Sequence, residues 1–278
     1  MAFISKRFQT QESLAERVKG ILTTANPLSK AKMAQSLARD WFGGHIETVG
    51  KVELPDDPAR PPKPRLCMPR DVPKRKINRG VMGRVNLLHA LAHIELNAID
   101  LAFDIIARFP EISLPRAFYD DWVRVGEDEA RHFLMLEKRL KTLGSFYGAL
   151  PAHDGLWSAA RETRHNFLAR LAIVPMVLEA RGLDVTPAMI GKLKQADDVE
   201  SARILQTIHD DEITHVAAGK RWYSFICQQD QLDEETTWQA LVRAFFKGQL
   251  KRPFNYQSRT RAGLPRSFYD TIAMDEVV

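Results

Sequence analysis

The chain has 278 residues, of which 45% are hydrophobic, and a formal net charge of +5. This composition is enough for a buried core and fits one large domain or two small ones. Cys67 and Cys227 are the only cysteines, which excludes a disulfide framework, a Cys-rich zinc site and a four-cysteine iron–sulfur centre.

The sequence gives no sign of a targeting or membrane-spanning segment. The opening stretch, "MAFISKRFQTQESLAERVKG", lacks the apolar segment and cleavage site of a signal peptide. No apolar run approaches the roughly 20 residues that a helix needs to cross a bilayer. We therefore expect a cytoplasmic protein without a membrane partner.

Residues 1–80 are predicted to form an accessory segment. Its periodicity favours helices over 11–23 and 29–42, separated by Asn26-Pro27 and closed by Gly43-Gly44. Residues 54–73 contain seven prolines and little periodicity. This stretch is typical of an extended connector.

Residues 81–230 are predicted to form a four-helix bundle in an all-α protein. Helical patterns cover 83–109, 115–143, 158–182 and 197–228, with stop signals at Pro110, Gly144 and Gly182. Thr186 and Pro187 have the residue types of an N-cap and a first helical position, which predicts a short crossover helix after the third pattern. Residues 231–278 should contain one more helix, over 233–246, and a basic tail.

A repeated motif interrupts the apolar faces of the second and fourth of these helices. Both "EDEARH" and "DDEITH" contain Asp-Glu-x-x-His, giving Asp128, Glu129 and His132 in one copy and Asp211, Glu212 and His215 in the other. A buried charge is costly unless it is paired or bound to a metal. Two copies of the longer motif are also hard to attribute to chance.

Two further acids complete a pattern typical of two-metal sites in helical bundles. Such sites take one Glu from each of two helices and Glu-x-x-His from each of the other two. Glu95 precedes Glu129 by 34 residues and Glu179 precedes Glu212 by 33 residues, which is one helical hairpin each time. Any one of these residues alone is more often a surface or ion-paired group. Together they predict a metal site of Glu95, Glu129, His132, Glu179, Glu212 and His215.

Other candidate ligands are set aside. Glu162 and His165 form a third Glu-x-x-His, but they lack the Asp and lie far along the helix from Glu179. His93 projects about 200° away from Glu95 around the helix. We therefore expect His89 and His93 to make surface or accessory-helix contacts. Asp100 and Asp104 are expected on a polar face or in capping contacts.

With these residues in hand, the chain resembles the ferritin-like superfamily of di-iron carboxylate proteins, and more closely a bacterial ferritin-like family of uncharacterised function. The resemblance covers roughly residues 83–228, through "HALAHIELNAIDLAFD", "DDWVRVGEDEARHF", "VPMVLEARGLD" and "DDEITHVAAGKRWY". It implies that Glu129 and Glu212 bridge the metals, that Glu95 and His132 complete one ion, and that Glu179 and His215 complete the other.

The same resemblance implies a role for the acid before each bridging Glu. Asp128 and Asp211 look like the acids that orient the metal-bound histidines of bacterial multicomponent monooxygenases. There, the Asp of one motif accepts the N–H of the His of the other motif. Asp128 would thus accept from His215, and Asp211 from His132.

The leading functional prediction is an O2-dependent oxidoreductase, a hydroxylase or oxidase with two iron ions, for which manganese is the alternative metal. Four alternatives remain open: a ferroxidase or metal-handling protein, a manganese-dependent peroxide-consuming enzyme, a tRNA-modifying hydroxylase-like enzyme, and a non-catalytic helical binding module. Missing Cys-x-x-Cys pairs disfavour a rubrerythrin-type peroxidase. An external electron donor is required.

The basic runs at 60–79 and 247–266 read mainly as solvated surface. They are also compatible with an anionic substrate and, as the less favoured interpretation, with binding to a nucleic acid. The substrate itself, whether small molecule or anionic group, is not identified by the sequence.

Overall fold

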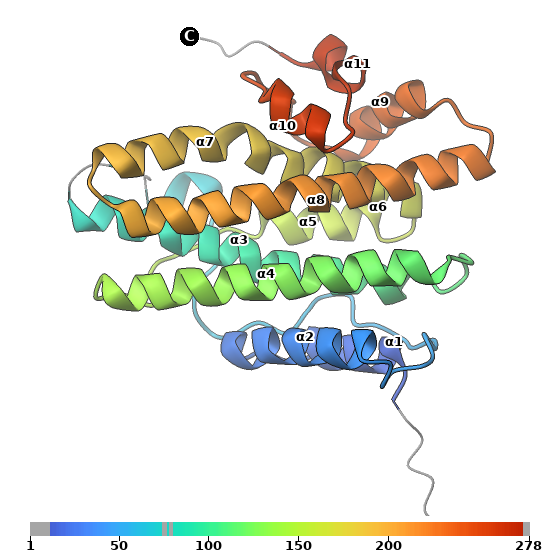
Figure 1. Cartoon of the computed structure of the whole chain (residues 1–278), viewed down its shortest axis with the longest axis horizontal. Helices are drawn as coiled ribbons and strands as arrows, with labels where there is room; N and C mark the ends of the chain where they lie inside the picture. Colours follow the sequence, from blue (N-terminus) through green and yellow to red (C-terminus); the bar gives the residue numbers. More distant parts are fainter. Residues whose placement is uncertain (1–11, 74–76, 78–79, 275–278) are drawn as a thin grey trace, which may run out of the picture.

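The computed structural model of the chain describes residues 12–73, 77 and 80–274, and the secondary structure of these residues is helical apart from two isolated bridges. The predicted all-α fold is confirmed. Figure 1 shows long helices in the middle of the molecule, with the N-terminal helices on one side and the C-terminal helices on the other. Over these described residues, no helix is both long enough and apolar enough to cross a membrane.

The first long hairpin consists of α3 (Val81–Arg108) and α4 (Arg116–Thr142). Helix α4 ends as the stop signal at Gly144 predicts, because Gly144 adopts φ +76°, a left-handed conformation that glycine tolerates. Within the hairpin, Gly126 of α4 lies against Phe103 of α3, and an added Cβ would lie 2.6 Å from the Phe103 ring. Glycine therefore lets these two helices approach closely.

The second hairpin is more segmented than the sequence indicates. It consists of α5 (Gly155–Thr163), α6 (Phe167–Ile173), the π-helical segment η2 (Val174–Glu179), α7 (Ala180–Gln195) and α8 (Val199–Gln229). The prediction of one helix over 158–182 is wrong. Asn166 has an extended backbone and its side chain accepts the N–H of Ala169, so a new helix starts there.

The predicted crossover helix at Thr186 and Pro187 is also wrong, because α7 continues through both residues and through Gly182. A proline inside a helix leaves the carbonyl four residues earlier without its N–H partner. Here that carbonyl belongs to Leu183, and the side-chain amide of Asn255 donates to it at 3.2 Å. A residue from the C-terminal segment thus compensates the missing bond.

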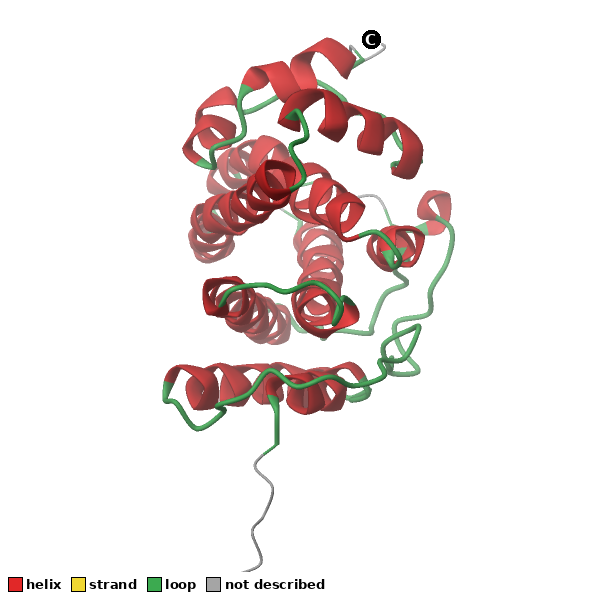
Figure 2. Ribbon diagram, turned by 90° about the vertical axis from the view of Figure 1, so that its right-hand side faces the viewer, coloured by secondary structure: helices red, strands yellow, loops and turns green. Residues whose placement is uncertain are grey.

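The N-terminal helices match their prediction closely. Helix α1 (Leu14–Leu22) starts with a capping box between Ser13 and Glu16, and α2 (Pro27–Phe42) starts with Asn26 as N-cap and Pro27 in the first turn. Figure 2 shows them as a layer beneath the bundle. The connector that follows contains the short 3-10 turn η1 (Pro69–Asp71).

The C-terminal region begins as predicted with α9 (Glu234–Phe245), but the expected basic tail is folded. It contains α10 (Tyr256–Arg261), α11 (Arg266–Tyr269) and the 3-10 turn η3 (Asp270–Ile272). Arg259 is buried and bonds Asp184 of α7, while Arg252 bonds Asp270. Much of this positive charge is therefore neutralised within the chain.

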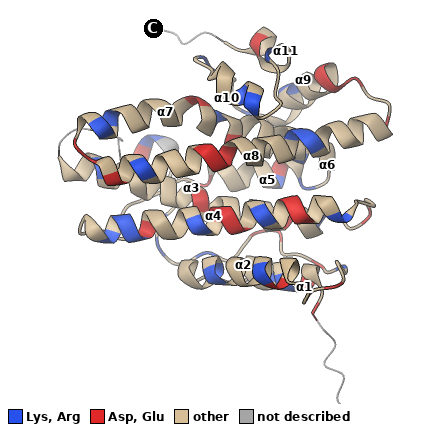
Figure 3. Ribbon diagram, in the orientation of Figure 1, with Lys and Arg blue, Asp and Glu red and all other residues tan. Residues whose placement is uncertain are grey.

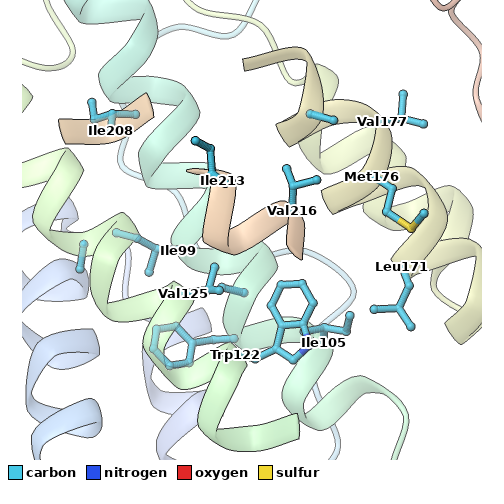
Figure 4. Packing of buried hydrophobic residues seen from close by; sticks show 14 of the residues in the cluster. Ile99, Ile105, Trp122, Val125, Leu171, Met176, Val177, Ile208, Ile213 and Val216 are labelled. Atoms are coloured by element: carbon cyan, nitrogen blue, oxygen red, sulfur yellow. The ribbon is translucent and has the colours of Figure 1, made fainter. Parts of the chain in front are cut away.

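The core lies between the hairpins. Figure 4 shows Ile99 and Ile105 of α3, Trp122 and Val125 of α4, Met176 and Val177 of η2, and Ile208, Ile213 and Val216 of α8 around one interior. All these side chains are buried. Close packing of this kind fixes the helices firmly and so fixes the direction of any polar side chain among them.

Candidate metal centre

The two Asp-Glu-x-x-His motifs face each other from α4 and α8. Figure 3 shows acidic segments midway along both helices. Glu129 lies between the two imidazoles, with Oε1 3.0 Å from His215 Nδ1 and Oε2 3.5 Å from His132 Nδ1. Glu129, His132 and His215 are all at most 1% exposed. A spacing of three residues places the Glu and His of each motif on one face of the helix.

Two further carboxylates join this pair. Glu95 of α3 has its Oε2 3.3 Å from His132 Nδ1, and Glu212 of α8 has its Oε2 3.7 Å from His215 Nδ1. One ligand atom from each of Glu95, Glu129, His132 and Glu212 lies within 4.8 Å of the others. These buried groups could hold a metal ion.

Glu179 reaches the site from the end of the π-helical segment η2. A π-helical turn contains an extra residue, and such turns are frequent at functional sites. Glu179 lines the same cavity as Glu95 and Glu212. Gly219 of α8 packs against Pro175 of η2, where an added Cβ would lie 2.4 Å from the proline ring. The glycine therefore allows α8 to approach the segment that carries Glu179.

Each imidazole has its second nitrogen bonded to an Asp of the opposite motif. His132 Nε2 lies 2.9 Å from Asp211 Oδ2, and His215 Nε2 lies 3.4 Å from Asp128 Oδ2. Because an ionised carboxylate only accepts hydrogen bonds, each Nε2 must donate. This arrangement directs both Nδ1 atoms toward the glutamates, as the in-trans pairing expected from the motif repeat requires.

Arg131 connects the two aspartates at the outer side of the site. Its Nη2 donates to Asp128 Oδ1 at 2.6 Å and to Asp211 Oδ2 at 3.0 Å. The Arg131 side chain is 38% exposed, whereas both imidazoles are fully buried. A chain of polar contacts thus leads from the surface through the aspartates to the histidines.

The pKa values reflect an excess of buried negative charge. Burial raises the pKa of Glu95 and Glu179 well above the usual range, and the neighbouring carboxylates Glu129 and Glu212, respectively, raise it further. Burial and Glu129 raise the pKa of Glu212 in the same direction. Burial also disfavours ionised Glu129, but the two adjacent imidazoles hold its pKa below the usual range.

The pKa values of the two histidines are also raised, which for an imidazole favours the charged form. Burial alone would lower the pKa of His132 and His215, but Asp211 and Asp128, together with the glutamates, raise it well above the ordinary value. In the metal-free chain a protonated imidazole, with its second proton on Nδ1, therefore balances part of the negative charge of the carboxylates. Bound cations would meet the same need.

Whether metal ions fit can be tested by counting the buried polar atoms that lack a hydrogen bond. Among the described residues, nine buried side-chain nitrogen or oxygen atoms lack a hydrogen bond, and seven of them belong to this cluster. They are Glu95 Oε2, both oxygens of Glu129, His132 Nδ1, Glu179 Oε2, Glu212 Oε2 and His215 Nδ1. Unsatisfied buried acceptors are rare in folded proteins. Oxygen and imidazole donors of this kind fit divalent iron or manganese.

The third Glu-x-x-His lies outside the cluster, as expected. Glu162 is exposed on α5 and bonds Lys247 at 2.6 Å. His165 is exposed in the break between α5 and α6, where Arg164 donates to it. Neither residue contributes to the group of buried ligands.

The expectation for His89 and His93 is wrong, because both are buried under the loop that follows α4. His89 Nε2 accepts the N–H of Gly148 at 2.9 Å, and His93 Nδ1 lies 2.8 Å from the Tyr147 hydroxyl. Burial lowers the pKa of both histidines to about 4. They hold the loop in place as neutral groups.

The expectation for Asp100 and Asp104 is also wrong, since both carboxylates are fully buried. Asp100 pairs with Lys30 of α2 and with Arg60 of the connector. Asp104 pairs with Arg170 of α6 and with Arg108. These ion pairs attach the neighbouring segments to α3, and the cationic partners compensate the burial of each acid.

Sequence reasoning did not identify Arg131 or the π-helical form of η2. The spacing of Asp128 and Arg131, three residues apart on one helix, was a signal for their ion pair. Pro175 within an apolar run was a signal for an irregular helix.

The fold and the site together define a helical-bundle protein with a buried carboxylate–histidine cluster. Residues 23–270 match the family described as "Protein of unknown function (DUF455)", and the chain belongs to this family. An uncharacterized protein of Haemophilus influenzae is 37% identical over 271 residues, which cover 92% of each chain. No solved structure matches the chain.

Proposed function

We propose that this chain is a ferritin-like carboxylate protein that binds two iron ions and acts as an O2-dependent oxidoreductase. The observation that carries the proposal is the convergence of seven unpartnered ligand atoms from six residues. These residues come from α3, α4, η2 and α8: ligand atoms of Glu95, Glu129, His132 and Glu212 lie within 4.8 Å of one another, His215 contacts Glu129, and Glu179 lines the same cavity as Glu95 and Glu212. This is the ligand arrangement of two-metal bundle sites.

Position supports the proposed division of ligands for Glu129 and Glu95. Glu129 lies between both imidazoles, which supports a bridging role. Glu95 is close to His132 and would complete one ion with it. Glu212 is the second proposed bridge, and Glu179 with His215 would complete the other ion.

The chain prepares these ligands in two ways. Asp211 and Asp128 hold the proton of each imidazole on Nε2, which leaves the Nδ1 lone pair for a metal. Burial of the carboxylates among apolar helices excludes bulk water and strengthens their attraction for cations. When bound, two ferrous ions supply the electrons for reducing oxygen. Manganese is the alternative metal for the same ligand set.

The cysteines of the chain provide no iron–sulfur route for repeated reduction. Cys227 is buried and Cys67 lies far from it in sequence, and two cysteines cannot build an iron–sulfur relay. We therefore propose an external electron donor as a partner.

Anaerobic reconstitution with ferrous iron tests this function. We expect two iron ions per chain by elemental analysis and a coloured oxidised centre after stopped-flow mixing with oxygen. Glu129→Ala should empty both positions, whereas Glu162→Ala, in the exposed third Glu-x-x-His, should keep both ions. A colourless, unreactive protein that holds only zinc would contradict the oxidoreductase proposal.

A further inference from the structure

A cavity of about 240 Å³ adjoins the carboxylate cluster. Its wall is built mainly by apolar side chains of α3, α7 and α8, among them Leu91, Leu101, Val185, Met189 and Ile208. On α7 the lining residues Gly182, Val185 and Met189 recur at helical spacing. One face of the helix therefore borders the cavity continuously.

The cavity reaches the cluster from its carboxylate side. Glu95, Glu179 and Glu212 line it, and each belongs to the same face of its helix as the apolar lining residues. Neither His132 nor His215 lines it. The Nε2 atoms of the imidazoles bond Asp211 and Asp128 on the side of the cluster where Arg131 lies. The cluster thus has an apolar side and a polar side.

The charges along the wall favour an uncharged occupant. Four carboxylates balance two divalent ions, so the filled centre proposed above carries no net charge from these groups. Arg181 is the cationic residue of the lining, and its Nη1 lies 3.5 Å from Asp184 Oδ2 and donates to the carbonyl oxygens of Lys251 and Pro253. An anionic ligand would therefore have to compete with Asp184 for this cation of the described wall.

We propose that this cavity is the substrate site and that it takes a small, uncharged, mainly apolar organic molecule. This inference rests on the proposed two-metal function, because the metals would lie where the carboxylates end the cavity. Apolar cavities of about 150 Å³ bind benzene or xenon. A volume of about 240 Å³ is therefore sufficient for a single substituted aromatic ring or a short alkyl chain.

Gly182 provides a way to fill the cavity without disturbing the ligands. It lines the cavity one turn after Glu179, and a Cβ added to it would meet no atom within 4 Å. Gly191 lies on the same helix, is equally free of contacts and does not line the cavity. The two glycines are nine residues apart, which places them on opposite faces of α7.

The probe for the test is 4-fluorotoluene, followed by fluorine NMR with the full-length protein, metal-free and iron-loaded. We expect saturable binding to the wild type, at least tenfold weaker binding to Gly182→Leu, and unchanged binding to Gly191→Leu. The smaller change Gly182→Ala, which favours the helix, should weaken binding in the same direction. Metal content should be the same in all variants.

Equal affinity of wild type and Gly182→Leu for 4-fluorotoluene would overturn the proposal. Binding of 4-fluorobenzoate as tight as that of 4-fluorotoluene would overturn its uncharged character. Metal content separates this inference from the proposed function. If two iron ions bind but the probe does not, the cavity proposal fails alone. If the probe binds in a Gly182-dependent way but iron does not, the metal proposal fails and only the apolar ligand site remains.

Discussion

His132 of α4 and Asp211 of α8 are joined across the bundle, with His132 Nε2 2.9 Å from Asp211 Oδ2. Asp211→Asn removes the carboxylate charge while keeping the size of the side chain. The imidazole should then lose its fixed orientation and part of its basicity. We expect metal affinity to fall about 10 to 100-fold, as is common when such partners are removed. A competition titration with a chromogenic chelator measures the change.

Asp210→Asn is the matched control for this experiment. Asp210 is the preceding residue of α8, is exposed, and accepts from Gln206 on the same helix. Its replacement should leave metal affinity unchanged. Asp211→Asn with wild-type affinity would show that the aspartate does not orient a ligand.

The contact between Gly219 of α8 and Pro175 of η2 determines how closely these two segments pack beside the site. Gly219→Ala places a Cβ 2.4 Å from a proline ring that is fixed to the backbone of η2, so α8 and η2 must move apart. We expect a loss of about 1–3 kcal/mol in stability, as for other overpacked positions. Because Glu179 ends η2, one metal should also bind more weakly. Urea unfolding and metal titration measure the two effects.

Gly191→Ala tests whether the effect depends on this contact. An added Cβ at Gly191 meets no atom within 4 Å, so the alanine should be neutral or stabilising. If Gly191→Ala lost as much stability as Gly219→Ala, the loss would come from replacing a helical glycine and not from the contact with Pro175.

The first hairpin could be predicted from sequence because its signals are local. Apolar periodicity and Gly144 predict α3 and α4 to within about two residues. The repeated Asp-Glu-x-x-His motif likewise indicates which side chains share a face. Convergence of Glu95, Glu129, His132 and Glu212 is therefore a consequence of helical spacing combined with the hairpin length.

The errors arise where distant residues decide the local structure. Helix α7 passes through Pro187 because Asn255, far along the chain, donates to the carbonyl of Leu183 that Pro187 leaves without an N–H partner. Asp100 is buried because Lys30 and Arg60 both reach it. The local sequence around Pro187 and Asp100 does not reveal these distant partners. It therefore predicts an N-cap at Thr186 and a polar face at Asp100, and both predictions are wrong.

Lys30 and Asp100 form an ion pair between α2 and α3 in which both side chains are at most 1% exposed. Lys30→Met leaves the buried carboxylate with Arg60 alone. Removing one partner of a buried pair costs about 3–5 kcal/mol. Because Arg60 still compensates part of the Asp100 charge, we expect a loss toward the lower end of that range in the free energy of unfolding, measured with urea at neutral pH. Lys32→Met, at an exposed position of the same helix, should leave stability nearly unchanged. Equal effects of the two changes would show that the pair contributes nothing specific.

His89 gives the chain a defined dependence of stability on pH. Its Nε2 accepts the N–H of Gly148, and burial lowers its pKa to about 4 from an ordinary 6.5. Between these values the unfolded chain binds a proton that the folded chain does not. Stability is therefore complete above pH 6.5, falls as the pH drops toward 4, and is constant below that with respect to this group. Such a shift corresponds to about 3 kcal/mol at full extent.

His89→Gln removes the titrating ring and retains an acceptor for Gly148. Urea unfolding of the metal-free protein at pH 7.5 and pH 4.5 should show a loss of stability that is smaller by about 2–3 kcal/mol in His89→Gln than in the wild type. His165 serves as the control, because His165→Gln removes an exposed imidazole. This variant should lose as much stability as the wild type. If His89→Gln and the wild type lose the same amount between the two pH values, then His89 takes up its proton as readily in the folded chain as in the unfolded one, and the hydrogen bond to Gly148 does not hold the ring neutral.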